Sequence, residues 1–297
     1  MNVSASFSAP YAAPGKLNLM LRVVGRRADG YHLLQTVFRL IDYGDTLRFR
    51  VTADGVIARL TEIEGVPAES DLCVRAARLL QQVTGTTLGA DIQLKKRLPL
   101  GGGLGGGSSD AATTLLALNQ LWKTAVPRTQ LLDLSVKLGA DVPIFVFGKN
   151  ALAEGIGEQL RALELPPAWY VVLCPPVEVS TSAVFGHPDL KRDSKKVTIQ
   201  GFSSAISGVS SSDYFVNDLQ ALVVRQYPEV ACYLAWLSGH AVASKAQMTG
   251  SGACVFASFD TEAEAQRVIA QLPADMKGFV AQGLQSHPLH ALGDAIQ

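Results

Sequence analysis

Charge of one sign, cysteine and long hydrophobic runs are all scarce in this 297-residue sequence. Lysine and arginine together number 26, as do aspartate and glutamate, so the formal net charge is zero. A neutral chain argues against nucleic acid or an anionic membrane as the main partner. No apolar run reaches the roughly 18 residues of a membrane span, so we expect none. Near Met1 no basic segment precedes an apolar one, so we expect no signal peptide.

The four cysteines are Cys73, Cys174, Cys232 and Cys254, and no C-x-x-C spacing joins them. This distribution indicates buried thiols in a reducing compartment, not a disulfide framework or a zinc site. We therefore expect a cytoplasmic protein. Hydrophobic residues make up 48% of the chain, which is typical of a globular protein. The length exceeds what one core normally supports, so we expect two lobes.

The most informative stretch is rich in glycine. Six of the seven residues from 101 to 107 are glycine, so their backbone amides can approach a ligand closely and adopt positive φ. Apolar spacing predicts a strand over 90–98 and a helix over 111–122, with Ser108 or Ser109 as the helix N-cap. A strand, a glycine turn and a helix N-terminus in this order favour a phosphate-binding loop over a flexible linker.

Two common nucleotide motifs do not fit this loop. Gly101, Gly103 and Gly106 match G-x-G-x-x-G, but a dinucleotide fingerprint also needs an acidic residue at the end of the next strand, about 20 residues on. Residues 125–128 are Ala-Val-Pro-Arg, with neither strand pattern nor acid. A P-loop needs a lysine at its end, and none follows Gly107. The loop must belong to another phosphate-binding design.

Around this loop the pattern predicts a loose lead-in over 1–13, a half-buried strand over 15–24 and an Asp-Gly turn over 26–32. Further predicted elements of the first half are strands 33–40 and 45–51, and helices 71–84 and 127–138, the latter ending at Gly139. We expect the chain to cross between lobes over 148–157. The second half should contain strands 169–174, 254–259 and 279–282, helices from 181, from 217, over 228–237 and over 261–272, and a loop with some helix over 187–215. This β-α-β ending suggests a ferredoxin-like lobe.

Several single residues have both a structural and a functional interpretation. Lys16 alone is best explained as part of a solvated strand face. Tyr31 and His32 could stack on a nucleobase, although unaided we favour a structural role. Asp141 lies between a helix end and a buried segment, where it could cap a turn or accept a proton from a substrate hydroxyl. The cations of 95–97 could steer a polyphosphate or simply be solvated.

Three separated segments together resemble the motifs of the GHMP kinases, which phosphorylate small alcohols with ATP. These are 14–19, 99–109 and 249–253. Within that family, segments 25–32, 138–143 and 217–219 resemble a branch whose acceptor alcohol carries a cytidine diphosphate. The resemblance spans nearly the whole chain. It implies a two-lobed α+β fold, with an N-terminal ATP-binding, ribosomal-protein-S5-domain-2-like lobe over 1–157 and a C-terminal ferredoxin-like lobe over 158–297, and the active site in the cleft between them.

The resemblance also assigns roles to residues. Asp141 would act on the attacking hydroxyl, with Lys16 holding it ionised and stabilising developing charge. Lys96 would lie near the adenine, and Ser108 or Ser109, with Ser108 preferred, near Mg²⁺. The ATP phosphates would be wrapped by Pro99, Leu100, Gly101, Gly102, Gly103, Leu104, Gly105, Gly106, Gly107, Ser108 and Ser109. The acceptor would be bound by Asn18, Tyr31, His32, Phe185 and Gly250, which reverses the preference for a structural Tyr31 and His32. Asp71 departs from an asparagine common near the adenine in relatives, so it is left out of the predicted site.

ATP, Mg²⁺ and a cytidine-diphosphate-linked polyol are thus the expected ligands, and a monomer or weak homodimer is the expected assembly. Three alternatives stay open. The first is a related kinase acting on mevalonate, homoserine or a sugar, against which Tyr31 and His32 argue. The second is a nicotinamide-dependent oxidoreductase, which the poor fingerprint disfavours. The third is an inactive nucleotide-binding module, against which the presence of both Lys16 and Asp141 argues.

Overall fold

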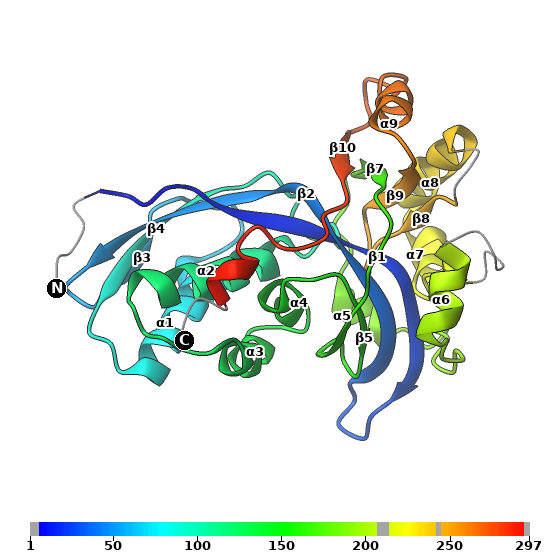
Figure 1. Ribbon diagram of the computed structural model, residues 1–297. Coiled ribbons are helices and arrows are strands. Elements are labelled where there is room, and N and C mark those ends of the chain that lie inside the picture. Colours follow the sequence, from blue (N-terminus) through cyan, green and yellow to red (C-terminus); the bar gives the residue numbers. More distant parts are fainter. Residues whose placement is uncertain (1–5, 207–213, 242–244, 294–297) are drawn as a thin grey trace.

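A long β-hairpin runs through both halves of the molecule in the computed structural model (Figure 1), which describes residues 6–206, 214–241 and 245–293. Its strands are β1 (Tyr11–Arg26) and β2 (His32–Thr52), paired antiparallel from end to end. The strands predicted over 33–40 and 45–51 are therefore one strand. The predicted lead-in over 1–13 is wrong beyond residue 10, because β1 already begins at Tyr11; residues 1–5 lie outside the described part.

The hairpin belongs to a six-stranded sheet of order β3-β4-β2-β5-β6, with β1 paired to β2. β2 is long enough to pair with β4 at one end and with β5 at the other. The remaining strands of this sheet are β3 (Ile57–Arg59), β4 (Gly89–Lys95), β5 (Ala151–Glu154) and β6 (Gln159–Ala162). The predicted division after 157 falls between β5 and β6, which pair with each other. The predicted lobe crossing over 148–157 is therefore wrong, because β5 lies within it.

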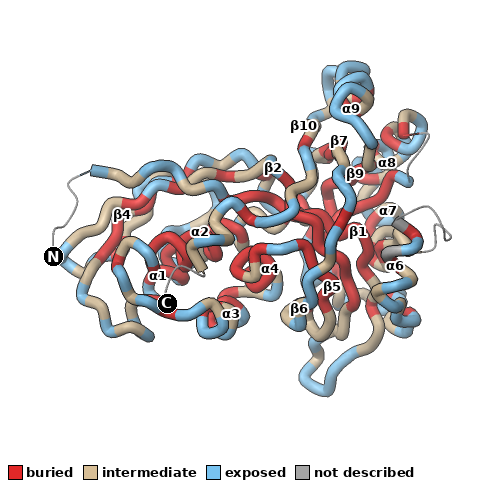
Figure 2. The backbone as a smooth tube through the Cα atoms, viewed as in Figure 1, coloured by how far each residue is buried: buried red, intermediate tan, exposed pale blue. Residues whose placement is uncertain are grey.

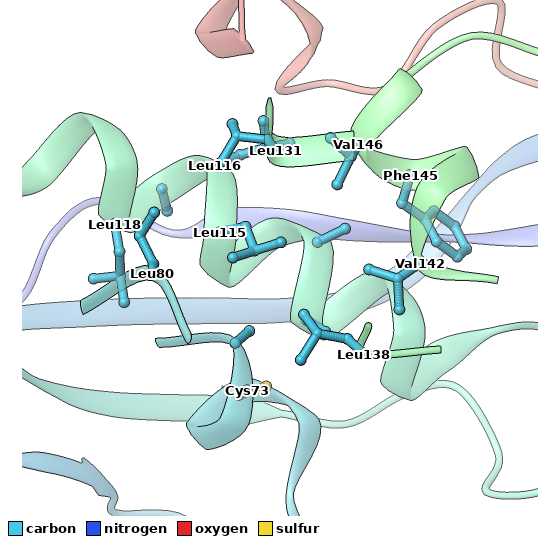
Figure 3. Packing of buried hydrophobic residues seen from close by; sticks show 14 of the residues in the cluster. Cys73, Leu80, Leu115, Leu116, Leu118, Leu131, Leu138, Val142, Phe145 and Val146 are labelled. Atoms are coloured by element: carbon cyan, nitrogen blue, oxygen red, sulfur yellow. The ribbon is translucent and has the colours of Figure 1, made fainter. Parts of the chain in front are cut away.

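Helices cover one face of this sheet and enclose its core. They are η1 (Ala68–Ser70), α1 (Leu72–Thr84), α2 (Gly106–Leu121), α3 (Arg128–Val136) and α4 (Val142–Phe147). Helix α2 is buried along most of its length and contacts α1 and α4 (Figure 3). Its side chains Leu115, Leu116 and Leu118 lie in the same cluster as Leu80 and Phe145. The loop that precedes α2 is thereby attached to a closely packed part of the first lobe. Helix α3 ends at Val136, before the predicted Gly139.

The second sheet is antiparallel, of order β10-β7-β9-β8. In chain order, β7, α8, β8, β9, α9 and β10 form the β-α-β-β-α-β pattern of a ferredoxin-like unit, as predicted. Its strands are β7 (Trp169–Leu173), β8 (Gln247–Met248), β9 (Val255–Phe259) and β10 (Gly278–Gln282). Its helices are α5 (Thr181–Gly186), α6 (Ile199–Ile206), α7 (Gln220–Gln226), α8 (Pro228–His240) and α9 (Glu262–Ile269).

Local sequence signals of the second half are largely confirmed. The capping box of Thr261 and Glu264 opens α9, and α5 begins at Thr181. The loop predicted over 187–215 contains α6, while its residues 207–213 lie outside the described part. The cysteines are only partly as predicted: Cys73 and Cys254 are buried, Cys174 is partly buried, and Cys232 is exposed on α8.

Strand β1 is buried on both faces where the two sheets meet, as the red segments of Figure 2 show. The prediction of a half-buried strand is wrong because the face expected to meet water is also covered: Asp141 of the first lobe lies against Lys16, and Thr249 of the second lobe lies against Asn18. The alternation is also broken by a register shift between Asn18 and Met20. As a result Leu21 lines the same cavity as Lys16 and Asn18, although strict alternation would place it on the opposite face.

After β10 the chain returns to the first lobe, where the turn η3 (His290–Gly293) contacts α2 and α4 (Figure 1). Leu284 donates its N–H to the Leu40 carbonyl at 2.8 Å and accepts from the Asn150 amide at 2.8 Å. These bonds tie the segment after β10 to strand β2 and to the residue just before β5. Within the described ranges no helix combines the length and hydropathy needed to cross a bilayer.

Candidate active site

Two adjoining cavities lie where the hairpin, the glycine-rich segment and helix α5 meet. The first has a volume of about 390 Å³ and is lined by both predicted catalytic residues and by most of the predicted ATP loop. The second, of about 1100 Å³, is lined by Tyr31 and His32. They share six lining residues, among them Thr181 and Phe185. The arrangement offers one compartment for a phosphate chain and another for a flat group.

The glycine loop (residues 99–107) needs glycine for both conformation and space. Gly101, Gly103 and Gly105 have φ of +65°, +75° and +72°, a region that other residues enter only with strain. A Cβ on Gly103 would stand 2.3 Å from the Thr249 carbonyl oxygen. The loop is fastened to β1 by the Lys16 N–H, which donates to the Leu104 carbonyl at 2.9 Å. Its backbone therefore forms a fixed wall of the first cavity.

Helix α2 begins inside this loop, one turn earlier than predicted. Its N-cap is Gly105, and no side chain caps it, so Ser108 and Ser109 as N-caps are wrong. The two serines instead lie in the first turn, because the left-handed Gly105 already turns the chain into the helix. Ser108 lines the first cavity, whereas Ser109 is fully buried. Amides of a first helical turn have no partner within the helix, and here they border the first cavity.

Lys16 and Asp141 meet at the other side of this cavity. Lys16 is 1% exposed, and its Nζ lies 3.2 Å from Oδ2 of Asp141. Nζ also donates to Oδ1 of Asn18 at 2.7 Å and lies 5.5 Å from the centre of the Phe38 ring. The Asp141 side chain is 38% exposed, so one carboxylate stays accessible from the cavity while the amine beneath it is held in place.

Asn18 is fixed by two threonines that the sequence reasoning missed. Its amide donates to Thr36 Oγ1 at 2.8 Å, and its backbone N–H donates to Thr249 Oγ1 at 3.0 Å. Thr249 lies in the segment 249–253, one of the three that resemble the family motifs. Thr36 lies in no such segment. Two more missed hydroxyls, Thr181 and Ser251, line the first cavity 2.7 Å apart. Gly250, predicted to bind the acceptor, lines the same cavity.

Lys96 is held between two acids below the glycine loop. Its Nζ donates to Asp110 at 2.8 Å and also to Asp45. Asp45 in turn accepts from the backbone N–H groups of Arg97 and Leu98, at the entrance to the glycine loop. Burial raises the pKa of Asp110 to about 7, against the lowering effect of Lys96. The pKa of Lys96 is raised, because the two carboxylates outweigh its burial.

Asp71, left out of the predicted site, has a structural role. Its Oδ1 accepts from the Cys73 N–H to cap α1, and its Oδ2 lies 2.7 Å from Nη1 of Arg59.

The second cavity brings the three predicted nucleobase contacts together. Tyr31 is 60% exposed, as is suitable for a ring that a ligand covers. The rings of His32 and Phe185 lie 5.1 Å apart between centroids, with planes tilted by 36°. Burial lowers the pKa of His32, and Arg192 and Arg26 lower it further. The wall is thus aromatic and carries a neutral imidazole.

The chain matches the family models described as GHMP kinases N terminal domain, over residues 71–149, and GHMP kinases C terminal, over 204–278. It is 58% identical over 286 residues to 4-diphosphocytidyl-2-C-methyl-D-erythritol kinase of Nitrosospira multiformis, which covers 96% of this chain and 94% of that protein. A crystal structure of 4-(cytidine 5'-diphospho)-2C-methyl-D-erythritol kinase matches with a TM-score of 0.78 and 32% identity, covering 93% of this chain and 99% of that one.

A crystal structure of L. major mevalonate kinase in complex with R-mevalonate shares the fold at a TM-score of 0.67 and 14% identity, covering 96% of this chain and 98% of that one. The two family models and the relative at 58% identity show that the chain belongs to the GHMP kinases. Within that family its high-identity relatives place it among the 4-diphosphocytidyl-2-C-methyl-D-erythritol kinases.

Proposed function

We propose that this protein transfers the γ-phosphoryl group of ATP to the 2-hydroxyl of 4-diphosphocytidyl-2-C-methyl-D-erythritol, giving the 2-phosphate and ADP. The reaction belongs to non-mevalonate isoprenoid precursor biosynthesis. The observation that carries the proposal is the pair Lys16 and Asp141. These residues are far apart in sequence, yet Nζ of Lys16 lies 3.2 Å from Oδ2 of Asp141 in the cavity that the glycine loop lines. The names of the relatives at 54–58% identity supply the acceptor.

The proposed chemistry uses few side chains. The acceptor hydroxyl gives its proton to the Asp141 carboxylate as its oxygen bonds to the γ-phosphorus, and the bond to the ADP oxygen breaks. The buried Lys16 ammonium stabilises the charge that develops on the transferring group. Loop amides and the N-terminus of α2 hold the triphosphate in line with the hydroxyl.

Mg²⁺ fits the polar groups of this cavity. Mg²⁺ in kinases is held by few protein oxygens, substrate phosphates and water. The described residues contain no cluster of three acidic, histidine or cysteine ligands, so a site built from the Ser108 hydroxyl and the phosphates is the fitting kind. When bound, the ion would neutralise charge on the phosphates. Ser109 is fully buried and does not line the cavity, which leaves Ser108 as the hydroxyl for the ion.

The remaining roles follow the cavities. The second cavity takes the cytosine between Tyr31, His32 and Phe185, and Asn18 and Gly250 line the pocket of the erythritol chain. Lys96 borders both the first cavity and a smaller one between α1 and the glycine loop, which supports its place near the adenine. We further propose a cytoplasmic location for an ATP-using protein with free thiols. The assembly we expect is a monomer or weak homodimer.

The test is ADP release with four acceptors: diphosphocytidyl-methylerythritol, mevalonate, homoserine and galactose. We expect turnover with the first at a kcat/KM at least a hundredfold above the others. Comparable turnover with mevalonate or homoserine would make this chain a different kinase of the family. A thermal-shift comparison should show stabilisation by ATP but not by NAD; stabilisation by NAD alone would revive the oxidoreductase alternative.

A further inference from the structure

Arg192 lies in the segment between α5 and α6, and its guanidinium group bonds His32 and Phe185, which line the second cavity, and residues that follow α5. Its Nε donates to Nε2 of His32 at 3.0 Å. Its two Nη atoms donate, at 2.7–3.3 Å, to the carbonyl oxygens of Phe185, His187, Pro188 and Leu190. One side chain therefore joins the start of β2 in the first lobe to the end of α5 in the second.

The bond between Arg192 and His32 fixes the protonation of the imidazole. A guanidinium is always charged in proteins and carries donors only. Its partner Nε2 must therefore present a lone pair, so His32 is neutral and its single proton is on Nδ1. The hydrogen bond at one ring nitrogen sets the tautomer at the other. In this state the imidazole has a donor, and no acceptor, to offer a ligand.

The charged surroundings of His32 favour the same state. Burial disfavours the imidazolium, and the cations Arg192 and Arg26 act in the same direction. The acidic residues that line the second cavity are Asp29 and Glu178. Asp29 pairs with Arg27 at 2.8 Å, so its charge is compensated locally. Among the described residues, His32 makes no hydrogen bond to a carboxylate that would hold a second proton on the ring.

We propose that Arg192 is a positioning residue that sets the base specificity of the acceptor site. It holds His32 as the Nδ1–H tautomer and keeps the end of α5, with Phe185, against it. This inference rests on the proposed function, since it takes a nucleobase as the occupant of the second cavity. Arg192 itself need not touch the substrate.

The tautomer has a consequence for which base is bound. Cytosine presents a lone pair at ring nitrogen N3, next to its carbonyl oxygen, whereas uracil presents an N–H there. The Nδ1–H of His32 can donate to N3 of cytosine. Against uracil it would face the N3–H, so that two donors would meet. A site that hydrogen-bonds one ligand rejects a close analogue strongly when buried polar groups are left unpaired. The arrangement therefore selects cytidine over uridine nucleotides.

The first measurement is of the tautomer itself, by ¹⁵N shifts of the imidazole nitrogens at neutral pH. The chain has five histidines, and the signals missing from His32→Asn identify those of His32. In the wild type we expect a protonated Nδ1 and an unprotonated Nε2. In Arg192→Met, Nε2 loses its donor and both tautomers become populated. A wild-type His32 that carries its proton on Nε2, or that is charged, would overturn the proposal.

The second measurement is kinetic. In Arg192→Met we expect the KM for diphosphocytidyl-methylerythritol to rise about tenfold while the KM for ATP changes less than twofold. The preference for binding CDP over UDP should fall about tenfold. Arg192→Lys keeps the charge but cannot serve His32 and the carbonyls together, so it should show the same trends if the methionine variant folds poorly. Arg225→Met is the matched control, since Arg225 pairs with exposed Asp189 and lies outside both cavities.

The two hypotheses fail differently. An unchanged acceptor KM and an unchanged CDP preference in both Arg192 variants would refute the role of Arg192 in an active enzyme. No turnover of the cytidylated acceptor by the wild type would refute the proposed function. In that event the ¹⁵N shifts and the CDP-over-UDP binding ratio still decide the claim about Arg192.

Discussion

Asp141 occupies the N-cap position of α4, yet its side chain makes no capping hydrogen bond there. A capping carboxylate contributes about 0.5–2 kcal/mol to helix stability, and here that contribution is forgone for contact with Lys16. The structural and functional interpretations of Asp141 thus compete for the same carboxylate. A residue that gives up local stability for an accessible charge in a cavity is typical of a functional site.

This gives a prediction for Asp141→Asn. The amide has nearly the same shape but cannot accept the hydroxyl proton, so kcat should fall roughly a hundred- to ten-thousand-fold. The affinity for ATP should change less than twofold, because the glycine loop is untouched. Single-turnover kinetics and ATP titration measure the two quantities. A kcat within tenfold of the wild type would remove Asp141 from proton transfer and leave it an orienting role.

At the scale of elements, the glycine loop is shaped by the second lobe as much as by the first. The Cys254 N–H donates to the Gly102 carbonyl at 3.2 Å, and Gly103 has no room for a Cβ against Thr249. The two glycine motifs therefore fold onto each other across the cleft. Closure of the phosphate site depends on both.

Gly103→Ala should consequently harm nucleotide binding. Alanine at a φ of +75° is strained, by roughly 1–2 kcal/mol, and its methyl group would meet the Thr249 carbonyl. We expect the KM for ATP to rise at least tenfold and the melting temperature to fall. Gly239→Ala is the control: Gly239 is within α8 with open space around it, so that variant should keep its KM for ATP. An unaltered KM in Gly103→Ala would show that the loop tolerates a displaced backbone.

Local signals predicted the elements well, because caps, turns and apolar spacing act over a few residues. The capping box at Thr261 and the strand before the glycine loop are examples. The N-cap of α2 was missed because a left-handed glycine can start a helix without a side-chain cap. The two-sided burial of β1 was missed because residues distant in sequence cover it, such as Asp141 over Lys16 and Thr249 over Asn18.

The site itself was predictable only where a motif marked it. The periodicity of the sequence does not predict that Lys16 lies next to Asp141. The family resemblance predicts it, and the structure places the two side chains together. Thr36 and Arg192 were not predicted as site residues, because each acts through a partner and lies in no motif. Arg192 is also distant in sequence from its partner His32. Lys16 illustrates the physical reason: a lysine on a strand usually meets water, and only the folded chain brings Asp141 and the glycine loop over this one.

At the scale of the whole molecule, two buried groups make stability depend on pH in opposite senses. Burial, Arg128 and His290 lower the pKa of His287 to about 3, so the unfolded chain binds a proton that the folded chain does not as pH falls below about 6.5. Stability is then lost by up to about 1.4 kcal/mol per pH unit. Asp110, with its pKa raised to about 7, binds a proton in the folded chain at a higher pH than in the unfolded chain. Its contribution to the free energy of unfolding therefore grows by a similar amount per pH unit as the pH falls from 7 to about 4.

The two effects should nearly cancel in the wild type between pH 6.5 and 4.5, and single substitutions should separate them. His287→Asn keeps an acceptor for the Leu289 N–H, which Nδ1 now accepts at 3.0 Å, but cannot titrate; its free energy of unfolding should rise as pH falls through this range. Asp110→Asn should instead lose stability on acidification, by about 1.4 kcal/mol per pH unit. Urea unfolding followed by tryptophan fluorescence, to which buried Trp122 contributes, measures both, with exposed Asp133→Asn as the charge control. Parallel pH profiles in all four proteins would contradict the opposing titrations, because removal of either group must change the slope if each binds its proton as described.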